Sequence, residues 1–141
     1  MPTAPTGSPA SDDRPEGRTC ALIDAGELDY GEALSLQMSL VAASRLGMLT
    51  SALIVLEHKP VITLGKSSPE EEAAFLSVKL HDRNIPIVRV NRGGRATFHG
   101  PGQLVAYPIV RLESGEVVDY VRALEQVIIS TLCHYSIEGV R

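Results

Sequence analysis

Apolar residues recur along the chain in two patterns, one typical of helices and one typical of buried strands. Over residues 29–46 they fall three or four positions apart, which predicts a helix that buries one face. The same spacing predicts a last helix over residues 117–135. Short continuous apolar runs predict buried strands over residues 51–57 and 61–64, the second ending at Gly65.

Proline and capping signals locate three further elements. Residues 68–71 read Ser-Pro-Glu-Glu, which predicts a helix running to about His81, with the serine as N-cap and the last glutamate completing a capping box. Residues 85–90 predict a strand whose proline places it at a sheet edge or at a strand start, and residues 104–112 predict another. Strands and helices mixed without strict alternation favour an α/β fold over a doubly wound Rossmann domain, with one mixed sheet and packed helices.

The first 19 residues differ from the rest in composition. They are rich in Pro, Ser, Thr, Asp and Gly and carry almost no large apolar side chain, so they cannot offset the entropy of ordering. We expect residues 1–19 to form a flexible, disordered tail and residues 20–141 to form one domain. A mitochondrial presequence is the alternative, but Asp12, Asp13 and Glu16 do not suit an acid-poor amphipathic helix.

Charge and cysteine content exclude several classes of protein. Thirteen Lys and Arg residues stand against 17 Asp and Glu, a net charge of -4, which argues against a general nucleic-acid binder. Two distant cysteines, Cys20 and Cys133, exclude a Cys-rich zinc module, and no metal site is predicted. No apolar stretch approaches the roughly 20 residues that cross a bilayer, and no secretory signal is apparent, so we expect a cytoplasmic protein without a membrane partner.

Residues 92–103 read Arg-Gly-Gly-Arg-Ala-Thr-Phe-His-Gly-Pro-Gly-Gln, with four glycines where a connection of this length needs one or two. The pair Gly93-Gly94 permits positive φ and close approach of another group. Residues 100–103 match a type II turn, with proline and glycine at its two central positions. This turn would hold His99 at its entrance.

Two interpretations of this segment stand level on composition alone. Its arginine, exposed backbone N–H groups and histidine suit an anion, carbonyl or thioester site, because they supply a fixed charge, oxyanion donors and a proton carrier. A glycine-rich hairpin with solvated Arg and His tips accounts for the same residues. The spacing of a phosphate loop and that of a dinucleotide fingerprint are both absent, so ATP binding has no independent support.

At this segment the chain resembles the octanoyltransferase family of lipoate biosynthesis. The matching string is Arg92-Gly93-Gly94, then residues 97–105, then Tyr107-Pro108-Ile109 and Leu112. Further similar blocks are Glu57-His58, residues 63–66 (Lys66 standing where the family commonly has Arg), and Tyr30 with Ala33 and Leu36-Gln37. The resemblance spans about residues 28–139.

The resemblance implies an α/β fold related to biotin and lipoate protein ligases, of which residues 20–141 would be the N-terminal part. It implies transfer of an octanoyl group from acyl carrier protein, through a cysteine thioester, to a lysine of lipoyl domains, those of 2-oxoacid dehydrogenase complexes and the glycine cleavage H protein. A cysteine thiolate suits this step chemically, because a nearby cation can lower the pKa of its thiol. No cofactor is implied. The residues that would line the acyl-substrate pocket are Arg92, Gly93, Gly94, Arg95, Ala96, Thr97, Phe98 and His99.

The family's catalytic lysine and cysteine lie in blocks that would follow Arg141, so no residue of this chain is assigned their roles. We therefore expect a fold truncated at its C-terminus and no transferase turnover by this chain alone. Cys133, near the end of the last predicted helix, is interpreted as a small packed hydrophobe. A non-catalytic module that binds the acyl chain or its carrier protein is the second hypothesis. An ATP-using ligase relative is the third, disfavoured by the His-Gly-Pro-Gly-Gln run.

Overall fold

The computed structural model describes residues 19–141, so the predicted tail lies, except for Thr19, outside the described residues. Six strands and three α-helices follow one another along the chain. Their bounds are β1 Ala21–Leu28, α1 Tyr30–Arg45, β2 Ala52–His58, β3 Val61–Leu64, α2 Glu70–Leu80, β4 Ile87–Arg89, β5 Ala96–His99, β6 Val105–Ile109 and α3 Val117–His134, with a 3-10 turn at His81–Arg83. The predicted α/β class, with parallel and antiparallel pairing combined, is confirmed.

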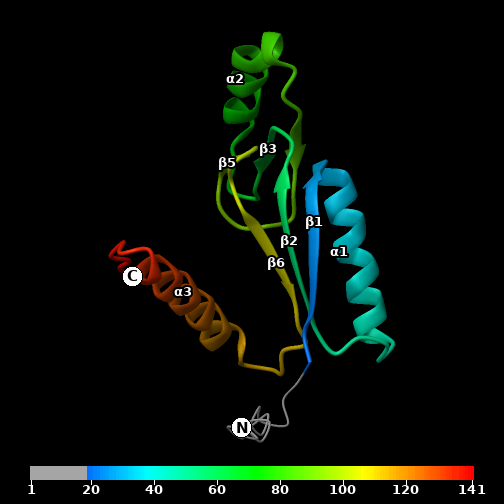
Figure 1. Cartoon of the computed structure of the whole chain (residues 1–141). Helices are drawn as coiled ribbons and strands as arrows, with labels where there is room; N and C mark the ends of the chain where they lie inside the picture. Colours follow the sequence, from blue (N-terminus) through cyan, green and yellow to red (C-terminus); the bar gives the residue numbers. More distant parts are fainter. Residues whose placement is uncertain (1–18) are drawn as a thin grey trace, which may run out of the picture.

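The strands form two three-stranded sheets, ordered β1-β2-β6 and β4-β3-β5 (Figure 1). In the first, β2 pairs parallel to β1 and antiparallel to β6; in the second, β3 pairs parallel to β4 and antiparallel to β5. Each parallel pair is joined by a helix, α1 or α2, as a parallel connection requires. The chain passes from one sheet to the other twice, at residues 59–60 and at residues 100–104.

The single predicted sheet is therefore wrong, and two strands were not predicted. In β1 the register shifts between Asp24 and Glu27 and Gly26 has a φ of 61°, so a bulge interrupts the alternation that marks a strand. Strand β5 lies inside the glycine-rich segment, and its antiparallel partner β3 is the buried strand that holds it. Both strands exist because of pairing partners far away in the sequence.

The core lies between α1 and the first sheet. Ala33 of α1 packs with Ile54 and Leu56 of β2, and half-buried residues of α1, β1 and β6 surround them. Strand β2 alternates buried and half-buried residues, and its buried row ends at His58. Burial of each large aliphatic side chain here stabilises the fold by about 1.5–3 kcal/mol. A histidine buried at the end of the same row needs hydrogen-bond partners, because its ring nitrogens are polar.

The helix ends differ from the sequence prediction at one place. The capping box predicted at Ser68 is wrong: Pro69 is the N-cap of α2, and the Ser68 hydroxyl is buried with no hydrogen-bond partner among the described residues. A reciprocal contact occurs at α1 instead, where the backbone N–H of Asp29 donates to Glu32 Oε2 at 3.2 Å.

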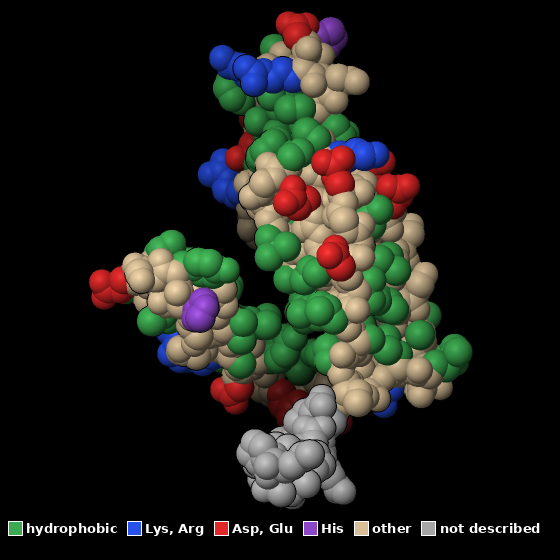
Figure 2. Space-filling model, viewed as in Figure 1, with side chains coloured by type: hydrophobic (Ala, Val, Ile, Leu, Met, Phe, Trp, Pro, Cys, Tyr) green, Lys and Arg blue, Asp and Glu red, His purple; other side chains and the backbone are tan. Residues whose placement is uncertain are grey.

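Helix α3 stands apart from the sheets and carries no buried residue (Figure 1). Hydrophobic side chains gather along it and along the body of the molecule beside it (Figure 2). Its large exposed apolar residues are Val117, Val118, Val121, Val127 and Ile128. Cys133 is exposed on this helix, so its interpretation as a small packed hydrophobe is wrong.

Candidate functional site

The predicted turn at residues 100–103 is present and well anchored. The N–H of Gln103 donates to the Gly100 carbonyl at 3.1 Å, and Gly102 has a φ of 84°, as the second central residue of a type II turn requires. The N–H of Gly102 donates to Glu57 Oε2 at 2.7 Å, which ties the turn to the end of β2.

Arg92 acts as an internal clamp. Its Nη1 donates to the carbonyls of Gly93 and Arg95 at 2.9 and 3.0 Å. Its Nη2 donates to the Thr63 carbonyl at 3.0 Å, to Thr63 Oγ1 at 2.6 Å and to Thr97 Oγ1 at 2.7 Å. Because these acceptors occupy both ends of the guanidinium fork, its first role is to hold the segment onto β3.

The glycine pair Gly93-Gly94 also packs against the backbone of residues 65–67. A Cβ at Gly65 would lie 2.7 Å from the Gly93 carbonyl oxygen and closer still to that of Gly94, so only glycine fits there. The N–H of Lys66 donates to the Arg92 carbonyl at 2.9 Å, and the N–H of Ser67 to the Gly94 carbonyl at 3.1 Å. Residues 65–67 and 92–94 therefore form one double loop, with Gly94 at a φ of 78°.

The other predicted site residues lie along β5. Arg95 is exposed and pairs with Glu72 Oε1 of α2 at 3.0 Å. Ala96, Thr97, Phe98 and His99 pair with β3, and the Phe98 ring is 52% exposed. The structure thus joins the eight residues in one strand and one loop. Their contact with an acyl chain stays a prediction.

A separate hollow of about 410 Å³ opens on the first sheet, close to the turn. Val55, Leu56 and Leu104 supply its apolar lining, Asp24, Gly26 and Glu27 line its rim, and Glu57 joins it to the turn. Its lining includes none of residues 92–99.

His58 is the functional candidate that sequence reasoning missed, because its partners lie 30 to 49 residues away. It is fully buried, with Nδ1 3.3 Å from the Leu28 carbonyl and Nε2 2.7 Å from the Tyr107 hydroxyl. Its ring centroid lies 5.5 Å from that of Tyr30, 5.7 Å from that of His99 and 5.9 Å from that of Tyr107. We call these four residues the His–Tyr cluster; they come from α1, β2, β5 and β6.

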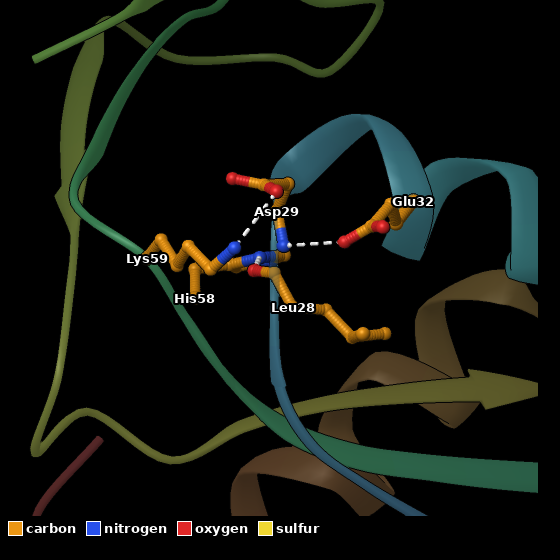
Figure 3. A network of polar contacts seen from close by, with 5 residues as sticks. All are labelled: Leu28, Asp29, Glu32, His58 and Lys59. Carbon is orange, nitrogen blue, oxygen red and sulfur yellow. Dashed lines mark hydrogen bonds and ion pairs between the residues drawn. The ribbon is translucent and has the colours of Figure 1, made fainter.

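The end of β2 is bound to the start of α1 by a small polar network (Figure 3). The Leu28 carbonyl accepts from His58 Nδ1 and from the Lys59 N–H, the latter at 3.1 Å. Lys59 Nζ pairs with Asp29 Oδ2 at 3.0 Å, and Figure 3 shows Glu32 contacting the Asp29 backbone from the other side. The contact with Asp29 raises the pKa of Lys59 above its ordinary value.

Burial sets the protonation of the His–Tyr cluster. It lowers the pKa of His58, the hydrogen bond to Leu28 partly offsets this, and His99 lowers it further. Burial likewise raises the pKa of Tyr107, as does the neighbouring Tyr30, while a hydrogen bond from Gln37 acts in the opposite direction. Near neutral pH, His58 and Tyr107 are therefore uncharged hydrogen-bonding groups.

Several other features bear on chemistry. Within residues 19–141, no group of three or more His, Cys, Asp or Glu side chains is placed to hold a metal ion. No helix in that part of the chain is both long and apolar enough to span a membrane. His81 is exposed next to Asp82, and Cys20, like Cys133, is exposed.

The sequence matches known proteins over most of its length. The profile of the lipoyl protein ligase A/B catalytic domain matches residues 29–141. An octanoyltransferase of Solibacter usitatus is 44% identical over 126 residues, covering 88% of this chain and 57% of the relative. An octanoyltransferase of Rubrobacter xylanophilus is 41% identical over 117 residues, covering 82% and 53% respectively. The chain spans about half the length of the curated relatives it matches.

Solved structures share the fold at low sequence identity. The bi-partite lipoate protein ligase of Thermoplasma acidophilum, studied with its E2 lipoyl domain, aligns with a TM-score of 0.67 and 14% identity over 89% of this chain and 49% of that one. A P. falciparum protein solved in complex with lipoate, LipL1, aligns with a TM-score of 0.62 and 16% identity over 86% and 38%. The predicted likeness to lipoate protein ligases is confirmed for the fold.

Proposed function

Because the chain belongs to the lipoyl protein ligase A/B catalytic domain family, we propose that it supplies the acyl-donor side of an octanoyltransferase. The reaction moves an octanoyl group from acyl carrier protein to a lysine of a lipoyl domain, in 2-oxoacid dehydrogenase complexes or the glycine cleavage H protein, in the cytoplasm. The observation that carries this proposal is identity of 37–44% to octanoyltransferases over most of the chain.

The arrangement of the similar blocks supports the proposal. Tyr30, His58, residues 63–66 and residues 92–107 are separate in the sequence, and the fold brings them into contact around the junction of the two sheets. The hollow beside the turn has a volume in the range of small-ligand pockets, and Val55, Leu56 and Leu104 give it an apolar side, in contrast to the carboxylates on its rim. We place the octanoyl thioester along β5 and the turn.

Within residues 19–141, neither cysteine lies at the site to act as the nucleophile. Cys20 and Cys133 are both exposed, and neither takes part in the contacts that surround His58 and residues 92–103. We therefore keep the expectation that this chain binds the donor and does not turn over by itself. A non-catalytic binding module is the alternative, favoured by the same observation.

Two measurements test the proposal. Calorimetry with octanoyl-acyl carrier protein and with the unacylated carrier should show saturable binding that is tighter for the octanoyl form. His99→Ala should weaken that binding, whereas His81→Ala, an exposed histidine on the 3-10 turn, should not. Arg92→Ala is unsuitable here because it would disturb the loop. Equal affinity for both carriers would contradict the proposal.

Mass spectrometry of a lipoyl domain incubated with octanoyl-acyl carrier protein separates the two hypotheses. We expect no octanoylated lysine above background with this chain alone. Octanoylation that depends on this chain would show instead that it carries its own nucleophile. Failure of a nucleotide to shift the melting temperature would exclude the ATP-using ligase.

A further inference from the structure

The hydrogen bonds around His58 fix which of its nitrogens carries the proton. A backbone carbonyl can only accept, so the Nδ1 atom that faces Leu28 at 3.3 Å must be the N–H nitrogen. In the neutral ring Nε2 then has a lone pair, and the Tyr107 hydroxyl donates to it at 2.7 Å. Both nitrogens of this fully buried ring are therefore used within the protein, and none is left for a substrate.

The same reasoning applied to His99 gives a different result. Gln103 Nε2 donates to the Phe98 carbonyl at 3.5 Å, which leaves Gln103 Oε1 to face the His99 ring. That oxygen accepts from His99 Nδ1 at 2.6 Å, so Nδ1 again carries the hydrogen. His99 Nε2 has no hydrogen-bond partner among the described residues, and in the neutral ring it can only accept.

The His58 ring also restrains the His99 ring. The two centroids are 5.7 Å apart with planes at 61°, an edge contact between the two rings. His58 is itself fixed through β1 by Leu28 and through β6 by Tyr107. His99 thus lies between a rigid buried ring and a turn glutamine.

We propose that His99 binds substrate through Nε2 as a hydrogen-bond acceptor for the amine of the acceptor lysine, and that His58 and Gln103 are positioning residues that hold it in this state. The inference rests on the proposed function, in which a thioester and a lysine amine meet. The thioester carbonyl can only accept a hydrogen bond, so it does not match an acceptor nitrogen. The lysine amine bears N–H groups in both of its protonation states and does match.

The test uses the 141-residue chain with ¹⁵N-labelled histidine. Two-bond ¹⁵N–¹H correlation spectra report the tautomer of each ring, with the exposed His81 and His134 as internal references. We expect His58 and His99 both to be Nδ1–H tautomers. An Nε2–H tautomer at His99 would overturn the inference.

The second stage titrates the labelled chain with Nα-acetyl-lysine amide and with Nα-acetyl-norleucine amide, which lacks the ammonium group. We expect the lysine compound to shift the His99 Nε2 resonance saturably and the norleucine compound to leave it unchanged. Tyr107→Phe removes only the hydroxyl that holds His58, and it should weaken the lysine response by roughly 2- to 10-fold, the equivalent of one hydrogen bond. If the Tyr107 hydroxyl only stabilised the fold, Tyr107→Phe would leave the response to the lysine compound unchanged.

Equal responses to the two compounds, or an unaltered response in Tyr107→Phe and in Gln103→Leu, would refute the assignment. The octanoyl donor is absent from this experiment. Its outcome is therefore separate from that of the carrier-protein binding that tests the proposed function.

Discussion

Replacing Arg92 by alanine should destabilise the fold far more than replacing Arg95, three positions later in the same loop. Arg92 donates five hydrogen bonds to four residues, and three of these go to Thr63 and Thr97 on the paired strands. Arg95 makes a single ion pair with Glu72 and is itself exposed.

The expected sizes follow from these contacts. A hydrogen bond from a charged donor contributes about 1.5–3 kcal/mol, but the carbonyls of Gly93 and Arg95 are exposed and water can replace the guanidinium there. What remains is the buried Thr63, whose carbonyl would lose the Arg92 donor. We therefore expect Arg92→Ala to cost about 2–3 kcal/mol, and Arg95→Ala about 0.2–1 kcal/mol, as for other exposed ion pairs.

Urea unfolding followed by circular dichroism measures both values. With a slope of about 2 kcal/mol per molar, Arg92→Ala should lower the midpoint by about 1 M or more, while Arg95→Ala shifts it by less than about 0.5 M. Equal losses in the two variants would refute the clamp. If Arg92→Ala lowers the free energy of unfolding by less than about 0.5 kcal/mol, the guanidinium is not needed to hold the loop and is available to bind a ligand.

Three further outcomes are expected. Gly65→Ala should cost at least about 1–3 kcal/mol in urea unfolding because its Cβ meets two carbonyl oxygens, whereas Gly31→Ala, with no atom within 4 Å in helix α1, should be neutral or stabilising. Gly102→Ala should cost about 1–2 kcal/mol by the same assay, since its φ of 84° disfavours a Cβ. Because the folded-state pKa of His58 lies below its unfolded value, the unfolded chain binds more protons as pH falls below about 6.5. The melting temperature should therefore fall between pH 7.5 and 5.5, and this fall should be smaller in His58→Phe; an unchanged pH dependence in that variant would exclude His58 as its source.

The sequence was sufficient for elements whose determinants are local. The helix predicted over residues 29–46 is α1 at Tyr30–Arg45, and the strand predicted over residues 61–64 is β3. The type II turn was also predictable, because proline and glycine fix its dihedral angles without help from the rest of the protein. The strand over residues 85–90 is predicted at a sheet edge or with its proline at a strand start, and β4 is at the edge of its sheet.

The role of Arg92 was not predictable in the same way. The residue type indicates a charged fork with five donors, which suits a ligand as well as it suits a loop. Only the pairing of β3 with β5 places Thr63 beside Thr97, where both accept hydrogen bonds from the Arg92 guanidinium. An arginine next to glycines is therefore weak evidence for an anion site until the backbone carbonyls around it are accounted for.

His58 shows what a sequence can still reveal about long-range contacts. In β2 the buried positions are Ala52, Ile54 and Leu56, and the same alternation places the next residue of that row at position 58. A histidine at a buried position needs hydrogen-bond partners for both ring nitrogens, because a buried polar nitrogen without a partner costs desolvation free energy. The alternation therefore predicts that partners exist, while their identity, 30 and 49 residues away, depends on the order of strands in the sheet. That order decides which aromatic residues of the separate blocks meet, and so it decides where the His–Tyr cluster forms.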